Sequence, residues 1–144
     1  APTIEVNQPK NDGFTPLHIA VINRNIPLIK LLLAHPNINP NFGTTDGATP
    51  LHFASMQAQT DIVKHLLEEG RVNVHASLNN GAYNGFTPLH FVVLNPDSVN
   101  VHETAKLLLM SGANPNAKCE AGKTPMDLTS VSIVQSLLKN PNSK

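Results

Sequence analysis

The chain has 144 residues, which is enough for one domain with a substantial core and too few for two ordinary ones. Ten Lys and Arg residues balance ten Asp and Glu residues, so the basic excess of a nucleic-acid-binding surface is missing. No apolar run approaches the roughly 20 residues of a membrane span. The first residues do not resemble a signal peptide, and a single Cys excludes an internal disulfide framework. We therefore expect an intracellular protein, cytoplasmic or nuclear.

Four of the twelve prolines mark an internal repeat. Thr-Pro-Leu-His occurs at 15–18, 49–52 and 87–90, and Thr-Pro-Met-Asp follows at 124–127. Successive threonines are 34, 38 and 37 residues apart, and a Gly stands two residues before each. A period in the thirties is typical of a solenoid of stacked units. The motif residues are Thr15, Pro16, His18, Thr49, Pro50, His52, Thr87, Pro88, His90, Thr124 and Pro125.

Each unit is predicted to contain a tight turn, two short helices and a loop. Gly suits the turn, Thr caps the first helix, and Pro opens it, because the N–H that Pro lacks has no helical partner there. The predicted first helices begin at Pro16, Pro50, Pro88 and Pro125, and the fourth is about four residues shorter. The predicted second helices begin at Pro27, at Thr60 and, with a capping-box pattern completed by Glu103, at Asn100.

The pattern Asp-Gly-x-Thr-Pro-Leu-His-x-Ala, followed by Ile-Val-x-x-Leu-Leu-x-x-Gly, resembles the ankyrin repeat from about residue 4 to 139. The resemblance implies an all-α solenoid of stacked helix-turn-helix units with β-turn fingers. Residues 1–144 would form one domain, with repeats at about 10–43, 44–81, 82–118 and 119–140. The last resembles a truncated capping repeat, with Asp127 in the His position. Residues 1–9 match the end of a unit, so we expect a piece of a longer array or an N-terminal extension.

The third unit departs from the pattern in two places. The turn before it is longer than the family turn, so we expect an extended finger carrying residues 79–83. A further insertion of about four residues, Pro96–Val101, separates its two predicted helices.

No residue pattern favours catalysis, a metal or a cofactor. The resemblance gives His18, His52 and His90 a structural role, as buttresses between units. No His pair has the helical spacing of a zinc site with an intervening Glu. Cys119 is interpreted as an ordinary exposed thiol. We therefore predict that this segment is not an enzyme and takes no cofactor.

Protein recognition is the function that the resemblance implies, through the concave face formed by fingers and first helices. Phe14, Tyr83 and Phe86 are either exposed interface anchors or packing between neighbouring fingers. We expect a protein or peptide partner, with no nucleic acid, no small-molecule substrate and no membrane insertion. The predicted contacts on the fingers are Asn11, Asp12, Phe14, Thr45, Asp46, Tyr83, Asn84, Phe86, Glu120 and Lys123. Those on the first helices are Ile22, Asn23, Met56, Gln57, Leu94 and Asn95.

Three alternatives stay open. The array could be the structural or regulatory arm of a larger enzyme or of a bacterial or viral effector acting in host cytoplasm, with the activity encoded elsewhere. The contact could lie on the Pro96–Val101 insertion instead of the fingers. Some ankyrin repeats are also hydroxylated at the asparagine that matches Asn116.

Overall fold

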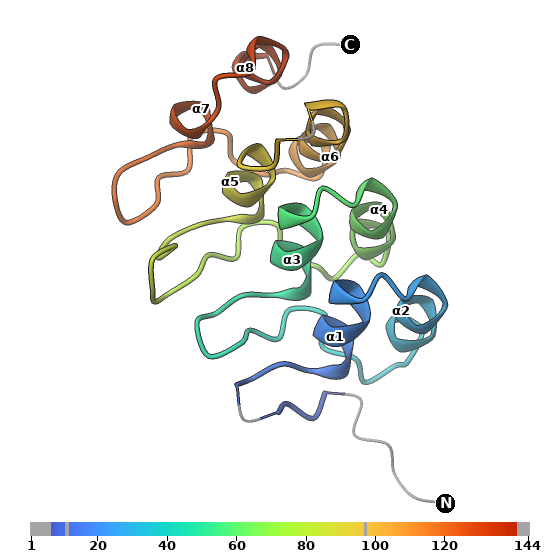
Figure 1. The fold of residues 1–144 in the computed structure, drawn as a ribbon. Coiled ribbons are helices and arrows are strands. Elements are labelled where there is room, and N and C mark those ends of the chain that lie inside the picture. The colour runs from blue at the N-terminus through green and yellow to red at the C-terminus, as the bar shows by residue number, and fades with distance from the viewer. Residues whose placement is uncertain (1–6, 11, 97, 141–144) are drawn as a thin grey trace, which may run out of the picture.

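The computed structural model describes residues 7–10, 12–96 and 98–140, and in that part of the chain every regular element is a helix. The helices form four pairs that stack along one direction (Figure 1). The first helices of the pairs are α1 (Pro16–Ile22), α3 (Pro50–Met56), α5 (Pro88–Val93) and α7 (Pro125–Leu128). The second helices are α2 (Ile26–Leu33), α4 (Thr60–Glu68), α6 (Ser98–Met110) and α8 (Ser132–Lys139). The predicted all-α solenoid is confirmed.

The pairs are arranged in two rows. Figure 1 shows the first helices in the middle, the second helices on one side, and long turns projecting on the other. Each first helix packs on the next first helix, and each second helix packs on the next second helix. Leu17, Leu51 and Leu89, one from each Thr-Pro-Leu-His motif, are fully buried between the rows. The core therefore runs continuously through the stack, as expected when no unit can bury its own apolar side.

The first helices begin where the motif predicts. The capping threonines have extended backbones, with φ near −90° and ψ near 168° at Thr15. Pro occupies the first turn of each first helix. The fourth first helix, α7, has 4 residues against 7 in α1, which agrees with its predicted shortening.

The predicted start of the second helix in the third unit, α6, is wrong. α6 already begins at Ser98 and has 13 residues, so Asn100 and Glu103 lie inside the helix and not at its cap. The insertion of Pro96–Val101 therefore lengthens α6 at its N-terminal end, where α2 has only 8 residues and α4 only 9. The capping-box pattern predicted the wrong start because the preceding residues also fit helical geometry once the stack supports them.

The predicted exposure of Cys119 is also wrong. Cys119 is 7% exposed and belongs to a second apolar cluster beneath the turns, with Ala48, Leu78, Phe86 and Phe91. Its N–H bonds the carbonyl of Lys123 at the base of the last turn, as the N–H of Leu78 bonds Phe86 in the turn before. Cys119 therefore occupies the position of a buried leucine, which explains its burial.

Candidate functional site

The projecting turns, called fingers here, are joined edge to edge by backbone hydrogen bonds. In the second, third and fourth fingers, one N–H donates to a carbonyl of the preceding finger. The bonds are Thr45 N to Asp12 O at 3.1 Å, Asn79 N to Asp46 O at 2.9 Å and Glu120 N to Asn84 O at 3.0 Å. The fingers therefore form a continuous wall beside the first helices (Figure 1).

The third finger is longer than the others, as predicted. Its closing bond joins Leu78 N to Phe86 O, eight residues on, whereas Thr44 N bonds Ala48 O, four residues on. The bonds to neighbouring fingers locate the added residues. Asn79 bonds to the finger before and Asn84 to the finger after. In the second finger the adjacent residues Thr45 and Asp46 make these two bonds, so four residues are added between Asn79 and Asn84. The insertion is therefore 80–83, and Tyr83 belongs to it.

Three motif histidines tie each unit to the next finger. His18 Nε2 lies 2.8 Å from the carbonyl oxygen of Ala48, His52 Nε2 3.1 Å from that of Phe86, and His90 Nε2 2.9 Å from that of Lys123. A carbonyl only accepts, so Nε2 donates and carries the proton. Nδ1 is then the acceptor, and it receives the N–H of the capping threonine in the same unit. Each imidazole therefore bridges two units in its neutral form.

Burial of these imidazoles disfavours the charged form. It lowers the pKa of His52 to about 4, although hydrogen bonds to backbone carbonyls oppose the shift. The pKa values of His18 and His90 are lowered for the same reason. These side chains are fully buried. They are therefore structural bridges and not acid–base groups open to a substrate.

Asp127 fills the His position in the fourth unit. Its Oδ2 accepts the N–H of Thr124 at 2.9 Å and the Thr124 hydroxyl at 3.1 Å. These hydrogen bonds lower the pKa of the Asp127 carboxyl. A carboxylate accepts but does not donate, so it reproduces the bonds within the unit and not the bridge to a following finger.

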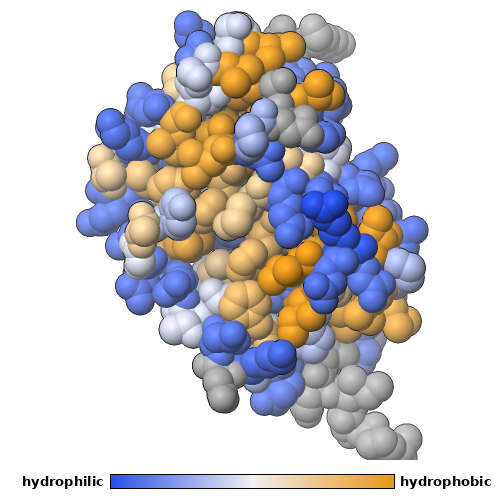
Figure 2. Space-filling model, in the orientation of Figure 1, coloured by the Kyte–Doolittle hydropathy of each residue, from blue (hydrophilic) through white to orange (hydrophobic). Residues whose placement is uncertain are grey.

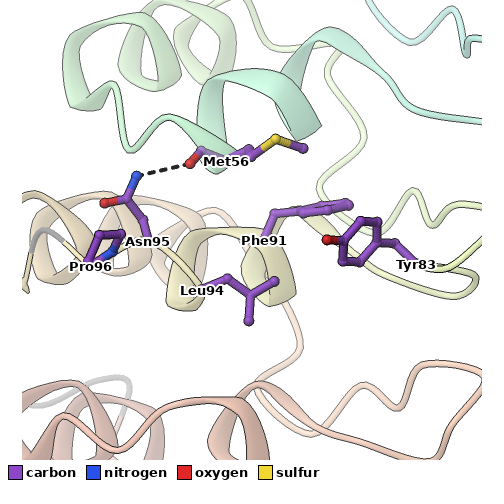
Figure 3. A pocket seen from close by; sticks show the side chains of 6 residues that line it. All are labelled: Met56, Tyr83, Phe91, Leu94, Asn95 and Pro96. Carbon is purple, nitrogen blue, oxygen red and sulfur yellow. Dashed lines mark hydrogen bonds between the residues drawn. The ribbon is translucent and has the colours of Figure 1, made fainter.

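One pocket, called the unit-three pocket here, lies between α3, α5 and the third finger (Figure 3). Its volume is about 260 Å³. Its lining residues are Met56, Tyr83, Phe91, Leu94, Asn95 and Pro96. Of these, Met56, Tyr83 and Leu94 are 41%, 48% and 44% exposed. A predominantly apolar, partly open hollow of this size suits recognition of a side chain.

The wall of the pocket is held in place by packing and by a bond between units. The Tyr83 ring lies 5.1 Å from that of Phe86 and 5.4 Å from that of Phe91, centre to centre. The Asn95 Nδ2 donates to the carbonyl oxygen of Met56 at 3.0 Å, across the boundary between units (Figure 3). Gln57 makes the corresponding contact to Ile22 one unit earlier, at 3.5 Å.

The structure distributes the predicted contact residues among three environments. The exposed ones are Asp12, Asn23, Thr45, Asp46, Met56, Tyr83, Leu94, Glu120 and Lys123. The half-buried ones are Phe14, Ile22, Gln57, Asn84 and Asn95. Phe86 is buried at 8% exposure, and Asn11 lies outside the described residues.

The aromatic residues separate according to this burial. Phe86 lies in the cluster beneath the fingers, with ring centres 5.1 Å from Phe91 and 5.0 Å from His90. Phe14 is half-buried, 5.4 Å from Phe53, in the first part of the stack. Tyr83 alone of the three is exposed. Phe86 therefore acts as packing between fingers, while Tyr83 presents its ring to solvent.

Two residues that line the pocket, Phe91 and Pro96, are not among the contacts predicted on the fingers and first helices. Pro96 begins the Pro96–Val101 insertion, which the sequence offers as an alternative contact, and Phe91 belongs to neither predicted surface. The signal for Phe91 was available, because Phe91 and Leu94 are three residues apart in adjoining helical turn positions. Only the packing of the third unit places Pro96 and Tyr83 at opposite ends of the same pocket (Figure 3).

The face of the molecule seen in Figure 2 carries apolar and hydrophilic surface. Apolar residues form a band across its middle, and hydrophilic residues lie along the finger edge and on the opposite side of the band. No group of three His, Cys, Asp or Glu residues in the described part of the chain is arranged to hold a metal ion. Within 7–140, leaving out 11 and 97, no helix is long and apolar enough to cross a membrane.

Comparisons with known proteins agree with this geometry. A family model described as ankyrin repeats (3 copies) matches residues 3–76 and 36–119. The bovine mitochondrial disaggregase is 33% identical over 143 residues, which cover 97% of this chain and 20% of the bovine protein. The human mitochondrial disaggregase is 29% identical over 167 residues, covering 97% of this chain and 23% of the human protein. The chain thus spans about a fifth of the length of these relatives.

Proposed function

This chain belongs to the ankyrin-repeat family, and on that premise we propose that it is a non-catalytic recognition module for a protein or peptide partner. The partner lies against the face shared by the first helices and the fingers. Any catalytic activity of a protein that contains this chain is encoded outside the segment.

The unit-three pocket is the observation that carries this proposal. Met56, Tyr83, Leu94 and Asn95 were predicted as contacts from their places in the repeat, and they come from three separate segments of the chain. In the structure they line one pocket. Exposed Tyr, Met and Leu side chains around a preformed hollow are suited to anchor a partner, because binding removes their apolar surface from water at small entropic cost.

The charges on this face favour a protein over a polyanion. Asp12, Asp46 and Glu120 are exposed on the fingers, against Lys123 from the predicted set. A nucleic acid would need several clustered cations to displace its counterions. We therefore propose a protein or peptide partner, and neither a nucleic acid nor a small-molecule substrate.

An affinity capture from the native cell tests the proposal, with two matched variants. Leu94→Asp places a charge on the pocket, and Leu31→Asp makes the same change on α2, in the other row, where Leu31 is 69% exposed. We expect Leu94→Asp to lose the captured partner and Leu31→Asp to keep it. Equal retention by both variants would refute binding through this face.

A second candidate function follows from the relatives. Because the chain spans about a fifth of two mitochondrial disaggregases, it is proposed as the recognition arm of a larger protein that acts on aggregated proteins. This role implies a mitochondrial location, as an alternative to the cytoplasmic or nuclear location predicted above. Fractionation of native cells shows which compartment contains the protein. The decrease in light scattering as an aggregated model protein is cleared tests the proposed role of the arm. Deleting residues 7–140 from the full-length protein should slow clearance, and unchanged clearance would contradict this role.

A further inference from the structure

Resting on the recognition function proposed above, we infer that the unit-three pocket is a socket for one uncharged apolar side chain of a peptide segment. The two insertions that distinguish the third unit build this socket. The pocket thereby selects the residue at one position of the partner.

Both insertions reach the same pocket from opposite ends. Tyr83 belongs to the insertion at 80–83 in the finger, and Pro96 begins the insertion that lengthens α6. Both line the unit-three pocket, with Phe91 and Leu94 of the intervening segment between them (Figure 3). Two separate additions to one repeat therefore converge on one hollow.

The socket exists before a partner arrives. The Tyr83 ring rests on Phe86 and Phe91, both of which are buried, and Figure 3 shows its hydroxyl directed toward the Phe91 side of the pocket. On the other side, the Asn95 amide is bonded to the Met56 carbonyl. A partner therefore orders few side chains of the pocket on binding, which favours affinity.

The lining decides which side chain is accepted. Apart from the phenol of Tyr83, no lining residue is ionisable. A charged side chain entering the pocket would lose hydration without gaining an opposite charge, whereas an apolar one is stabilised by leaving water. The pocket is thus complementary to Leu, Met or Phe and discriminates against Lys, Arg, Asp and Glu.

The pocket is open, so it receives only part of the partner. Met56, Tyr83 and Leu94, which line it, are 41%, 48% and 44% exposed. One side chain of the partner enters the pocket, and the rest of the segment continues outside it.

The chain carries its own reporter for this site. Tyr83 is the single Tyr, and there is no Trp, so intrinsic fluorescence excited near the tyrosine band reports on the pocket wall alone. We propose selecting twelve-residue peptides from a randomised phage library on the whole chain, then resynthesising the selected peptides without Tyr or Trp. Titration then follows Tyr83 emission and, independently, heat of binding.

The expected result has three parts. Selected peptides share one large apolar residue, their binding changes Tyr83 emission, and replacing that residue with Lys or Glu weakens binding at least about tenfold. Leu94→Asp weakens binding by a similar factor, while Leu31→Asp changes it less than about twofold. Circular dichroism and thermal melting confirm that both variants fold.

Other outcomes separate the inference from the function on which it rests. Peptides that bind Leu94→Asp normally but are lost by Asp12→Lys or Lys123→Glu would overturn the socket and leave recognition through this face standing. Peptides insensitive to all three changes, or no bound peptide at all, would overturn both. Concentration-dependent Tyr83 emission with a dimer in sedimentation would make a second copy the occupant and overturn the peptide assignment.

Discussion

The imidazole of His52 joins two units that lie 34 residues apart in sequence. Its Nε2 donates to the carbonyl oxygen of Phe86 at 3.1 Å, and its Nδ1 accepts the N–H of Thr49 at 2.9 Å. The Phe86 bond needs a proton on Nε2, and the Thr49 bond needs Nδ1 without one, so both form together only on the neutral ring. A second proton, on Nδ1, would face the Thr49 N–H and break the bond within the unit, while burial also disfavours the charge.

This relationship predicts that stability falls in mild acid. Burial lowers the pKa of His52 from 6.5 to about 4, and lowers those of His18 and His90. The unfolded chain binds protons near pH 6.5 before the folded chain does, so stability present above pH 6.5 is lost as the pH falls toward about 4. Each such His contributes a slope of up to about 1.4 kcal/mol per pH unit. Urea unfolding at pH 7.5, 6.5, 5.5 and 4.5 measures it.

The control for this pH dependence is His52→Gln, which removes one of the three titrations. The variant should start less stable at pH 7.5 and lose less stability on acidification. Equal free energies of unfolding at pH 7.5 and 4.5 in the unmodified chain would contradict the prediction.

Removing the His52 side chain should lower the free energy of unfolding more than removing Asp127, which fills the same position in the fourth unit. His52→Ala leaves the Thr49 N–H and the Phe86 carbonyl without their partner inside the stack, so we expect a loss of about 3 kcal/mol. Asp127→Ala removes bonds to Thr124 at the exposed end of the stack, where water replaces them, so we expect a smaller loss. Urea unfolding at pH 7.5 compares them, and equal losses would argue against the role of the bridge.

Gly85 should be far less tolerant of Ala than Gly122. Both have positive φ, +86° and +79°. A Cβ on Gly85 would lie 2.6 Å from the backbone nitrogen of Glu120, whereas one on Gly122 meets nothing within 4 Å. Gly122→Ala should therefore cost about 1 kcal/mol from backbone strain alone. Gly85→Ala should cost at least about 3 kcal/mol, because the contact also displaces the last finger. Thermal melting compares the two, and similar losses would refute the prediction.

Tyr83 and Phe86 should separate binding from stability. Tyr83→Ser removes a ring that is 48% exposed, so its effect on the free energy of unfolding should stay below about 1 kcal/mol while binding is lost. Phe86→Ser opens a cavity beneath the fingers and should cost about 4 kcal/mol. Denaturant unfolding and peptide titration give the two readouts. A large loss of stability in Tyr83→Ser would assign Tyr83 to packing.

The burial of the proposed contact residues was predicted only in part, and the aromatic residues show the reason. Phe14, Tyr83 and Phe86 all precede a capping Thr, so local pattern alone treats them alike. Phe86 is buried by Phe91 and by neighbouring fingers, while Tyr83 lies on an inserted loop that leaves one side of its ring in water. Burial by residues of another unit is not encoded in the spacing of one unit.

The sequence by itself determined the period, the family and the starts of the first helices, because caps, Pro positions and the Thr-Pro-Leu-His motif act within a few residues. Only the tertiary structure decided what depends on neighbouring units. Stacking buried Cys119, extended α6 back to Ser98, and brought Tyr83 and Pro96 to one pocket. These outcomes arise from side chains that are distant along the chain and meet only when the units are packed against one another.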